Sequence, residues 1–336
     1  LDITLSCSPP YLILYQTSID SYLLYETTRY TSCEAMNELT TSFIALKFGP
    51  RTHIRVAEGK QIPYEVPFCP SSNLATKLQD TPRYLFRVFS AASAGENSSK
   101  WMKSVDALKN NLTDIFKRDD TSRIALTLNE HLRWYQRKSN GDPFISWTTS
   151  LLVAIQYAIY KHKTESAELD TIYLCVIDTT LFPNGVFIKD IDLIEEFHDM
   201  HRGLSNLRKM RNTKYYFGEY LSQGQTNVSG RSCTVSCDKI INNHLFAMVH
   251  QFKVDIEDET ALWANAIVKS REPFYIMEQE VIDNSEFSGA MAIASEFGTR
   301  WSLPVLANLL ALSPRTARDP ANIGFILKLF SGACRS

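Results

Sequence analysis

The stretch that decides the fold is Phe144-Ile145-Ser146-Trp147-Thr148-Thr149-Ser150, together with the apolar run 151–160 that follows it. The first part is rich in aromatic and β-branched residues and follows a turn cluster at 139–143, which favours a short strand. The apolar density of 151–160 is typical of a buried helix, with Thr149 or Ser150 as its N-cap. Hydroxyl side chains are therefore expected at a strand-to-helix junction.

Two further stretches place a charged residue among apolar neighbours. One is Tyr84-Leu85-Phe86-Arg87-Val88-Phe89-Ser90, which alternates as a strand. The other is Phe217-Gly218-Glu219-Tyr220-Leu221-Ser222-Gln223-Gly224, which overlaps a strand predicted over 214–222. The separations of 59 residues from Arg87 to Ser146 and 73 from Ser146 to Glu219 leave room for the helices and strands between them.

In this order, the three stretches resemble the motifs of the Arg-Ser-Glu class of ADP-ribosyltransferases, which contains cholera-toxin-like and pierisin-like enzymes. Arg87 is similar to the arginine of the first strand of that class. Ser146-Trp147-Thr148 is similar to its Ser-Thr-Ser strand, and Glu219 with Gly224 to its third motif. The resemblance covers residues 82–252. The chain also resembles an uncharacterised fungal domain family, which has similar Phe-Arg-Val-Phe and Ser-Trp-Thr-Ser segments.

The resemblance implies that the protein cleaves the bond between nicotinamide and ribose in NAD, through a transition state that is positive on the ribose. Glu219 would be the catalytic carboxylate that faces this charge. Arg87 would hold the NAD diphosphate, because a guanidinium makes paired hydrogen bonds with phosphate oxygens. Ser146 would position Glu219 and the nicotinamide ribose, and Thr148 would support the NAD site as the third member of the hydroxyl motif.

The expected function is transfer of ADP-ribose from NAD to a protein or nucleic-acid acceptor, without a metal. Trp147 replaces the middle hydroxyl of the class, and it is expected to face away from Ser146 because alternate strand residues point to opposite faces. Phe217 replaces the Glu or Gln that engages the acceptor in many transferases of the class. Three alternatives therefore stay open: transfer to water (NAD glycohydrolase activity), an inactive binding or decoy protein, and an unrelated α/β domain.

Other polar residues are expected to have structural roles. His131 lies in a helix predicted over 124–137, and a helix-surface or cap role is expected for it. The basic residues of a helix predicted over 201–211 are expected on a solvated face, although the Arg- and Lys-rich segment 202–214 is also where acceptor contact is expected. Cys233 and Cys237 are interpreted as a pair on one strand face, since no second pair of ligands stands at zinc spacing.

Composition and patterning together predict an α+β fold. With 336 residues, 44% of them hydrophobic, the chain is long enough for a large core. An ADP-ribosyltransferase-like domain of two small sheets around an NAD cleft is expected at 81–255. An N-terminal extension of unknown role precedes it at 1–80, and a helical C-terminal module follows at 256–336.

The remaining predicted elements are helices at 101–117 and 190–197, strands at 172–178, 231–237 and 245–251, and C-terminal helices at 261–270, 288–297, 302–312 and 322–329. A further strand is expected at 52–56.

Charge, apolar runs and cysteine content give further expectations about partners and compartment. A net charge of −2 offers no overall field for nucleic acid or an anionic membrane. No apolar run approaches the roughly 20 residues of a membrane span, so none is expected. Seven scattered cysteines favour a reducing, intracellular compartment. Since the chain opens at Leu1, a native leader is expected to be missing, and localisation is otherwise left open.

Overall fold

The computed structural model describes residues 12–16, 22–26, 65–71, 73–133, 141–258, 263–276, 280–281, 284–312 and 315–317. They form a mixed α+β fold in two compact units. The larger unit combines 57–242 with 251–270, and the smaller one combines 1–56, 243–250 and 271–336. Each unit thus draws on segments far apart in the sequence. The strand expected at 52–56 and the helix expected at 322–329 lie outside the described residues.

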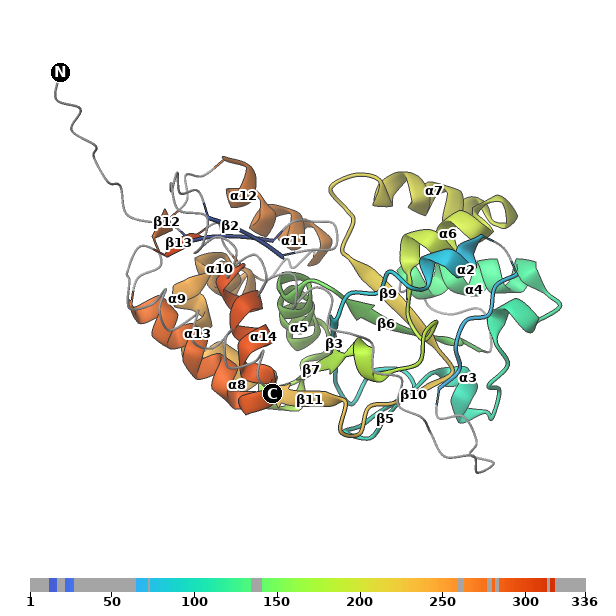
Figure 1. Ribbon diagram of the computed structural model, residues 1–336, viewed down its shortest axis with the longest axis horizontal. Coiled ribbons are helices and arrows are strands. Elements are labelled where there is room, and N and C mark those ends of the chain that lie inside the picture. The colour runs from blue at the N-terminus through green and yellow to red at the C-terminus, as the bar shows by residue number, and fades with distance from the viewer. Residues whose placement is uncertain are drawn as a thin grey trace, which may run out of the picture. The chain divides into compact units, whose positions relative to one another are not determined.

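The centre of the larger unit is a six-stranded sheet (Figure 1). Its order is β11 (Ser232–Ser236), β7 (Tyr173–Asp178), β3 (Tyr84–Phe89), β6 (Phe144–Thr148), β9 (Glu219–Gln223) and β8 (Ile188–Lys189), with antiparallel neighbours throughout. The middle strands β3 and β6 pair at one position only, Phe86 with Thr148. The sheet therefore consists of two three-stranded halves, which separate on either side of this pair.

A three-stranded sheet occupies part of the segment in which a helix was expected over 101–117, so that prediction is wrong. Its order is β10 (Gln225–Asn227), β5 (Trp101–Lys103) and β4 (Glu96–Asn97). Only the short helices α3 (Val105–Leu108) and η1 (Ile115–Lys117) follow β5, and the chain leaves α3 at Asn110, whose φ is +60°. Asparagine favours such turn conformations because its side chain bonds to the nearby backbone, which interrupts a longer helix.

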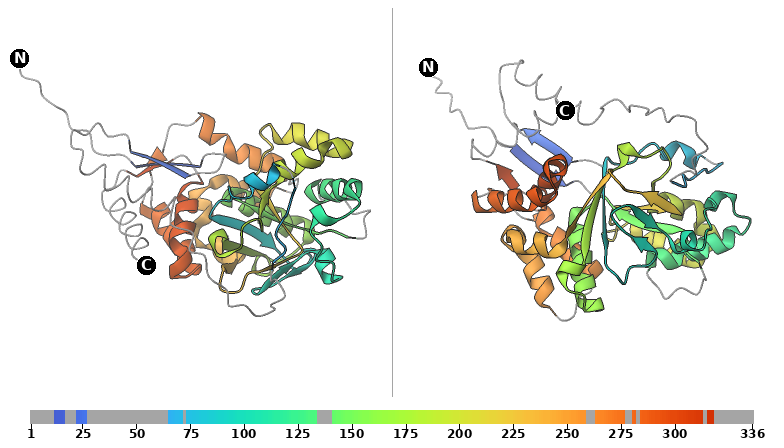
Figure 2. Two further views of the ribbon diagram at one scale, coloured as in Figure 1. Left: turned by 45° about the vertical axis from the view of Figure 1, so that its right-hand side comes forward. Right: turned by 90° about the horizontal axis from the view of Figure 1, so that it is seen from below.

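Four helices gather on the half-sheet formed by β6, β9 and β8, and Figures 1 and 2 show this grouping from three sides. They are α2 (Leu74–Lys77), α4 (Thr121–Arg133), α6 (Asp190–Phe197) and α7 (Arg202–Arg211). The last two confirm the helices expected at 190–197 and 201–211. Their apolar stripes form one core with Phe144, Ile188 and Leu221 of the strands, so these helices are packed on this half-sheet.

A second core lies on the side of the sheet that carries Leu85 and Trp147. Met102 of β5 contributes to it, so the small sheet covers this side. Trp147 is buried here, and its indole Nε1 donates to Ser222 Oγ over 2.9 Å. The prediction that Trp147 faces away from Ser146 is confirmed, since Ser146 bonds on the opposite face.

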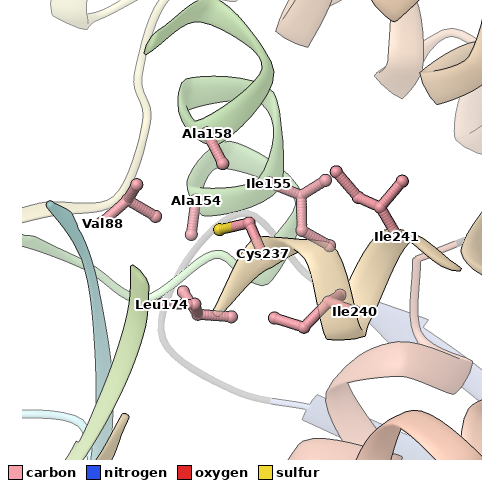
Figure 3. A pocket seen from close by; sticks show the side chains of 8 residues that line it. All are labelled: Val88, Ala154, Ile155, Ala158, Leu174, Cys237, Ile240 and Ile241. Carbon is pink, nitrogen blue, oxygen red and sulfur yellow. The ribbon is translucent and has the colours of Figure 1, made fainter. Parts of the chain in front are cut away.

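The helix α5 (Leu151–Glu165) follows β6 directly, as expected, and Ser150 caps it by accepting a hydrogen bond from Val153 N. It packs on β3 and β7. The side chains at this contact leave an apolar cavity of about 10 Å³, too small for more than one water molecule (Figure 3). The cavity is lined by Val88, Ala154, Ile155, Ala158, Leu174, Cys237, Ile240 and Ile241.

Cys233 and Cys237 do not share a strand face, because β11 ends at Ser236 and Cys237 begins α8 (Cys237–Ile240). Burial raises the pKa of the Cys237 thiol to about 12, which disfavours the thiolate that a metal needs. Within the described ranges, no group of three or more His, Cys, Asp or Glu side chains is arranged to hold a metal ion.

Helical structure replaces the strand expected at 245–251, which is therefore wrong. Here α9 (Phe246–Met248) is followed by α10 (His250–Glu257), and α11 (Trp263–Arg271) comes next. Residues 251–270 return to the larger unit and pack on α5, where Gln156 Nε2 donates to Asp255 and Ser270. An apolar run of this length fits a buried helix as well as a strand, and no neighbouring strand pairs with it here.

The smaller unit contains a four-stranded sheet and helices. The sheet has the order β12 (Glu280–Val281), β13 (Arg315–Ala317), β1 (Leu12–Gln16) and β2 (Tyr22–Glu26). Its helices include α12 (Pro273–Ile276), α13 (Asn284–Glu296) and α14 (Thr299–Leu310), and the last two pack together. Among the residues with a described position, no helix combines the length and apolarity needed to cross a bilayer.

The described residues also include the short helical turns η1 (Ile115–Lys117), η2 (Leu169–Thr171), η3 (Thr179–Leu181) and η4 (His198–Met200). The segment η5 (Ile241–Leu245) contains a kink, with non-helical φ and ψ at Asn243 and His244.

Candidate functional site

Ser146 and Glu219 are in direct contact. They lie on the paired strands β6 and β9, whose register sets Ser146 opposite Leu221 and Thr148 opposite Glu219. Ser146 Oγ lies 2.8 Å from Glu219 Oε1, within hydrogen-bond distance. The Glu219 side chain is only 11% exposed. Since a buried carboxylate is costly without partners, this hydroxyl contributes to holding Glu219 in place.

Arg87 joins the same cluster from β3, at the point where the two half-sheets separate. Its Nη1 donates to the Ser146 carbonyl over 2.8 Å, and its Nε and Nη2 both donate to Asn97 Oδ1, at 3.1 and 2.8 Å. Burial lowers the pKa of Arg87 below its ordinary value, with Tyr157 opposing the shift. A guanidinium nevertheless stays charged in proteins. Arg87 therefore presents a fixed cation beside Ser146.

His131 is a member of the site, so the expected helix-surface or cap role is wrong. It lies on α4, is 8% exposed, and its Nε2 is 2.7 Å from Ser146 Oγ. Its Nδ1 is 2.7 Å from Asp142 Oδ2. Asp142 comes from the loop just before β6 and also accepts a hydrogen bond from Phe144 N. A continuous chain of polar contacts thus runs from Asp142 through His131 and Ser146 to Glu219.

The hydrogen count of this chain is constrained, because each of its three contacts needs one hydrogen atom. With Asp142 ionised, two arrangements satisfy this count. If Ser146 donates to Glu219, His131 must donate to both Ser146 and Asp142, so His131 is an imidazolium and Glu219 is ionised. If Ser146 donates to His131 instead, Glu219 must carry a proton and His131 is neutral. The two arrangements contain the same number of protons. They differ in the position of one proton that His131 and Glu219 share through a hydroxyl.

Arg211, at the end of α7, contacts the other oxygen of Glu219. Its Nη2 donates to Glu219 Oε2 over 2.7 Å. Arg211 is only 5% exposed, so the expectation that it lies on a solvated face is wrong. By contrast, Arg208 on the same helix pairs with Glu195 at the surface. The helix α7 therefore directs one basic residue inward, to the site, and presents others to solvent.

Asp190 supports Arg211 from α6. Its Oδ2 lies 2.9 Å from Arg211 Nε, an ion pair outside hydrogen-bond geometry, and its side chain is fully buried. Burial raises the pKa of Asp190 to about 7, although Arg211 acts in the opposite direction. Asp190 is therefore a carboxyl group whose charge changes near neutral pH, and it is linked to Glu219 through Arg211.

Thr148 acts on the loop that leads into Glu219 rather than on Glu219 itself. Its Oγ1 donates to the carbonyl of Phe217 over 2.9 Å and accepts from Ser150 N. Gly218 has a φ of +64°, and its carbonyl accepts from Thr149 N. This left-handed conformation suits glycine and turns the chain into β9. Thr148 and Gly218 together fix the backbone conformation of the loop from which Glu219 enters β9.

Phe217 is buried at 4% exposure, with its ring 5.0 Å from that of Trp263. The guanidinium carbon of Arg211 lies 5.3 Å from the same ring. Tyr157 of α5 also contacts Trp263, at 6.0 Å between ring centroids. Burial raises the pKa of Tyr157 to about 12, with Arg87 lowering it and Glu219 among the groups that raise it. An aromatic cluster thus lies next to the charged residues.

The structure brings together Arg87, Ser146 and Glu219, the three main residues expected from the sequence, and places Thr148 one step away in the loop contact. Sequence reasoning missed His131, Asp142, Arg211 and Asp190. Only Asp142 had a local signal, since it stands in a turn cluster two residues before β6. Chemically, the arrangement supplies an oriented carboxylate, a fixed cation and a hydroxyl that links the carboxylate to an imidazole.

Comparison with known proteins adds a single match. The model of a family described as a domain of unknown function (DUF7587) matches residues 80–238, a range that includes every residue of this site. No curated protein and no solved structure matches the chain.

Proposed function

We propose that the protein cleaves the bond between nicotinamide and ribose in NAD and transfers the ADP-ribose to a macromolecular acceptor, protein or nucleic acid. Glu219 is the catalytic carboxylate in this proposal. Arg87 binds the diphosphate, Ser146 positions Glu219 and the nicotinamide ribose, and Thr148 supports the loop before Glu219. No step requires a metal.

The observation that carries the proposal is the contact of Ser146 with both Glu219 and Arg87. Through its hydroxyl it touches the carboxylate over 2.8 Å, and through its carbonyl it touches the guanidinium over 2.8 Å. A carboxylate stabilises a ribosyl cation only if its orientation is held before the reaction, and the hydroxyl provides this. These two groups of opposite charge meet where the two half-sheets separate, which is the arrangement expected for an ADP-ribosyltransferase-like core.

The arrangement also suits the polarity of NAD. The contacts of Arg87 use three of its five N–H groups within the described part of the chain, which leaves two for diphosphate oxygens. The pyridinium of nicotinamide is a good leaving group because it departs as a neutral ring, so the enzyme need not protonate it. Glu219 can therefore act in its ionised form, and the proton on the hydroxyl chain is not needed by the leaving group.

One observation favours transfer to water as a second candidate. Phe217 is buried against Trp263, so the residue two positions before Glu219 is turned inward and carries no polar group. A macromolecular acceptor would need another contact, and the exposed basic residues Arg202 and Lys209 of α7 and Lys214 after it are the nearest candidates in sequence. Hydrolysis needs no such contact.

Quantifying both products of NAD tests the proposal. The purified protein is incubated with NAD, alone and with a cell extract as a source of acceptors, and nicotinamide and free ADP-ribose are measured by chromatography. Transfer predicts that nicotinamide exceeds free ADP-ribose when the extract is present, with the difference bound to protein or nucleic acid. Hydrolysis predicts equal amounts in both conditions. If no nicotinamide forms above the protein-free control in either condition, the proposed activity is wrong and a binding role is favoured.

A further inference from the structure

We propose that Arg211 fixes Glu219 as the ionised end of the chain Asp142–His131–Ser146–Glu219, so that the proton shared along this chain stays on His131. Arg211 is then a positioning residue, which acts on the reaction through Glu219 and does not touch NAD. This role deepens the proposed function and rests on it for its importance to catalysis, because Glu219 must be ionised to face a ribosyl cation.

The two oxygens of Glu219 have different partners, which makes the assignment specific. Oε1 contacts a hydroxyl that is able to donate or to accept, whereas Oε2 contacts a guanidinium that only donates. A proton on Glu219 would weaken the contact with Arg211, and it would leave a buried cation with less compensation. The position of Arg211 therefore favours the arrangement in which Ser146 donates to Glu219.

The far end of the chain favours the same arrangement. An imidazolium at His131 lies between the Asp142 carboxylate and the Ser146 hydroxyl, and both of its N–H groups find acceptors, each at 2.7 Å. Moving the proton would shift one hydrogen from His131 to Ser146 and another from Ser146 to Glu219. No atom is gained or lost, and one charge pair, His131 with Glu219, disappears. Arg211 at one end and Asp142 at the other thus both oppose this transfer.

Asp190 limits how much of the Arg211 charge reaches Glu219. The two carboxylates share one guanidinium, at 2.9 Å from Nε and 2.7 Å from Nη2. Since burial raises the pKa of Asp190 to about 7, Asp190 is largely neutral below that pH and competes for Arg211 above it. Removing the Asp190 charge should therefore strengthen the hold of Arg211 on Glu219 in mildly alkaline solution.

Several other ionisable groups lie around the chain, and the test has to separate them from Arg211. They are Glu130 beside His131 on α4, Tyr157 on α5, Arg87 on β3 and Asp190 on α6. Each of them is unchanged in a comparison between Asp190→Asn and the double variant Asp190→Asn/Arg211→Gln, which differ only at Arg211. The double variant also avoids leaving a charged Asp190 buried without its partner, which would endanger folding.

The protonation of His131 can be measured directly by nuclear magnetic resonance. The full chain is labelled with ¹⁵N in its seven histidines, and His131→Asn identifies the signals of His131 by their loss. In the unaltered protein at pH 7, both ring nitrogens of His131 are expected to carry hydrogen. In Asp190→Asn/Arg211→Gln at the same pH, His131 Nε2 is expected to have lost its hydrogen towards Ser146 and Glu219, whereas in Asp190→Asn both ring nitrogens are expected to keep theirs.

Arg208→Gln is the matched control, because Arg208 lies on the same helix and pairs with Glu195 at the surface. It should leave both hydrogens on the His131 ring at pH 7. Three results would overturn the proposal: a neutral His131 in the unaltered protein at pH 7, a His131 ring that keeps both hydrogens in the double variant, or loss of the Nε2 hydrogen in the Arg208 control. If the double variant does not fold, Asp190→Asn decides, since Arg211 is intact in it and a neutral His131 there at pH 7 would overturn the proposal.

These outcomes are independent of NAD turnover. A protein that releases no nicotinamide but shows the expected hydrogens on the His131 ring in each variant refutes the proposed function and leaves the role of Arg211 intact. A protein that cleaves NAD while His131 is insensitive to Arg211 supports the activity and refutes the role of Arg211.

Discussion

Replacing Gly218 with alanine perturbs the turn that delivers Glu219 to β9. Gly218 has a φ of +64°, and a Cβ there would lie 2.3 Å from Thr149 Oγ1. That distance is well inside van der Waals contact, so the Thr149 side chain has to rotate or the loop has to move. We therefore expect Gly218→Ala to destabilise the fold and to displace Glu219 from Ser146.

The expected loss in the free energy of unfolding has two parts, and substitution of a second glycine measures one of them alone. Gly230 has a similar φ of +70°, but no atom lies within 4 Å of the position of an added Cβ. Gly230→Ala therefore reports the conformational cost alone, about 1–2 kcal/mol in the left-handed region. Gly218→Ala carries this cost and the clash with Thr149, which adds about 1–3 kcal/mol by analogy with overpacked cores. A total of about 2–5 kcal/mol is a large share of the stability of a typical domain.

Urea unfolding followed by circular dichroism measures both variants under the same conditions. The double variant Gly218→Ala/Thr149→Ala removes the atom that clashes, so its cost beyond that of Thr149→Ala alone should fall back to the value of Gly230→Ala. Equal destabilisation by Gly218→Ala and Gly230→Ala would refute the reasoning. So would a double variant that recovers nothing.

Two other substitutions test charge and hydrogen bonding in the site. Because burial raises the pKa of Asp190 from 3.8 to about 7, its contribution to stability is complete below pH 3.8 and is lost as the pH rises through about 7. The free energy of unfolding of the unaltered protein should therefore fall relative to Asp190→Asn between about pH 4 and pH 7, and an equal pH dependence of the two proteins across this range would count against the raised pKa of Asp190. Arg87→Lys keeps the charge but loses the fork that contacts Asn97 and Ser146, so KM for NAD should rise about tenfold or more with a smaller change in kcat. An unchanged KM would contradict the assignment of Arg87 to NAD binding.

Local pattern was sufficient for the elements whose own residues carry a strong signal. Alternation predicted the strand that became β3, and the hydroxyl cap with an apolar run predicted the junction of β6 and α5. The strand β5 was missed because it is only three residues long and its partner β10 lies far along the chain. At 245–251 a short apolar run did not distinguish strand from helix, and only its tertiary surroundings decide between them.

Some residues of the candidate site could be found from local sequence, and others depend on tertiary packing. Arg87, Ser146 and Glu219 were found because each lies in a recognisable stretch and the three follow a known order. His131 and Arg211 were taken for surface residues, since a single polar residue on a helix gives no sign of which face it occupies. Their burial results from the packing of α4 and α7 on the half-sheet of β6, β9 and β8. The contact between α4 and α7 joins segments about 70 residues apart in sequence, as between Arg133 and Gly203.

The central claim is that Glu219 is the carboxylate that cleaves NAD, and release of nicotinamide by Glu219→Gln tests it most directly. Glutamine keeps the size of the side chain and its contacts with Ser146 and Arg211 in part, but it removes the negative charge that faces the ribose. NAD labelled in the nicotinamide ring is incubated with each protein, and free nicotinamide is counted over time. We expect release by the unaltered protein and a rate about 100-fold or more lower for Glu219→Gln, with a similar melting temperature. Equal rates for the two proteins would contradict the claim.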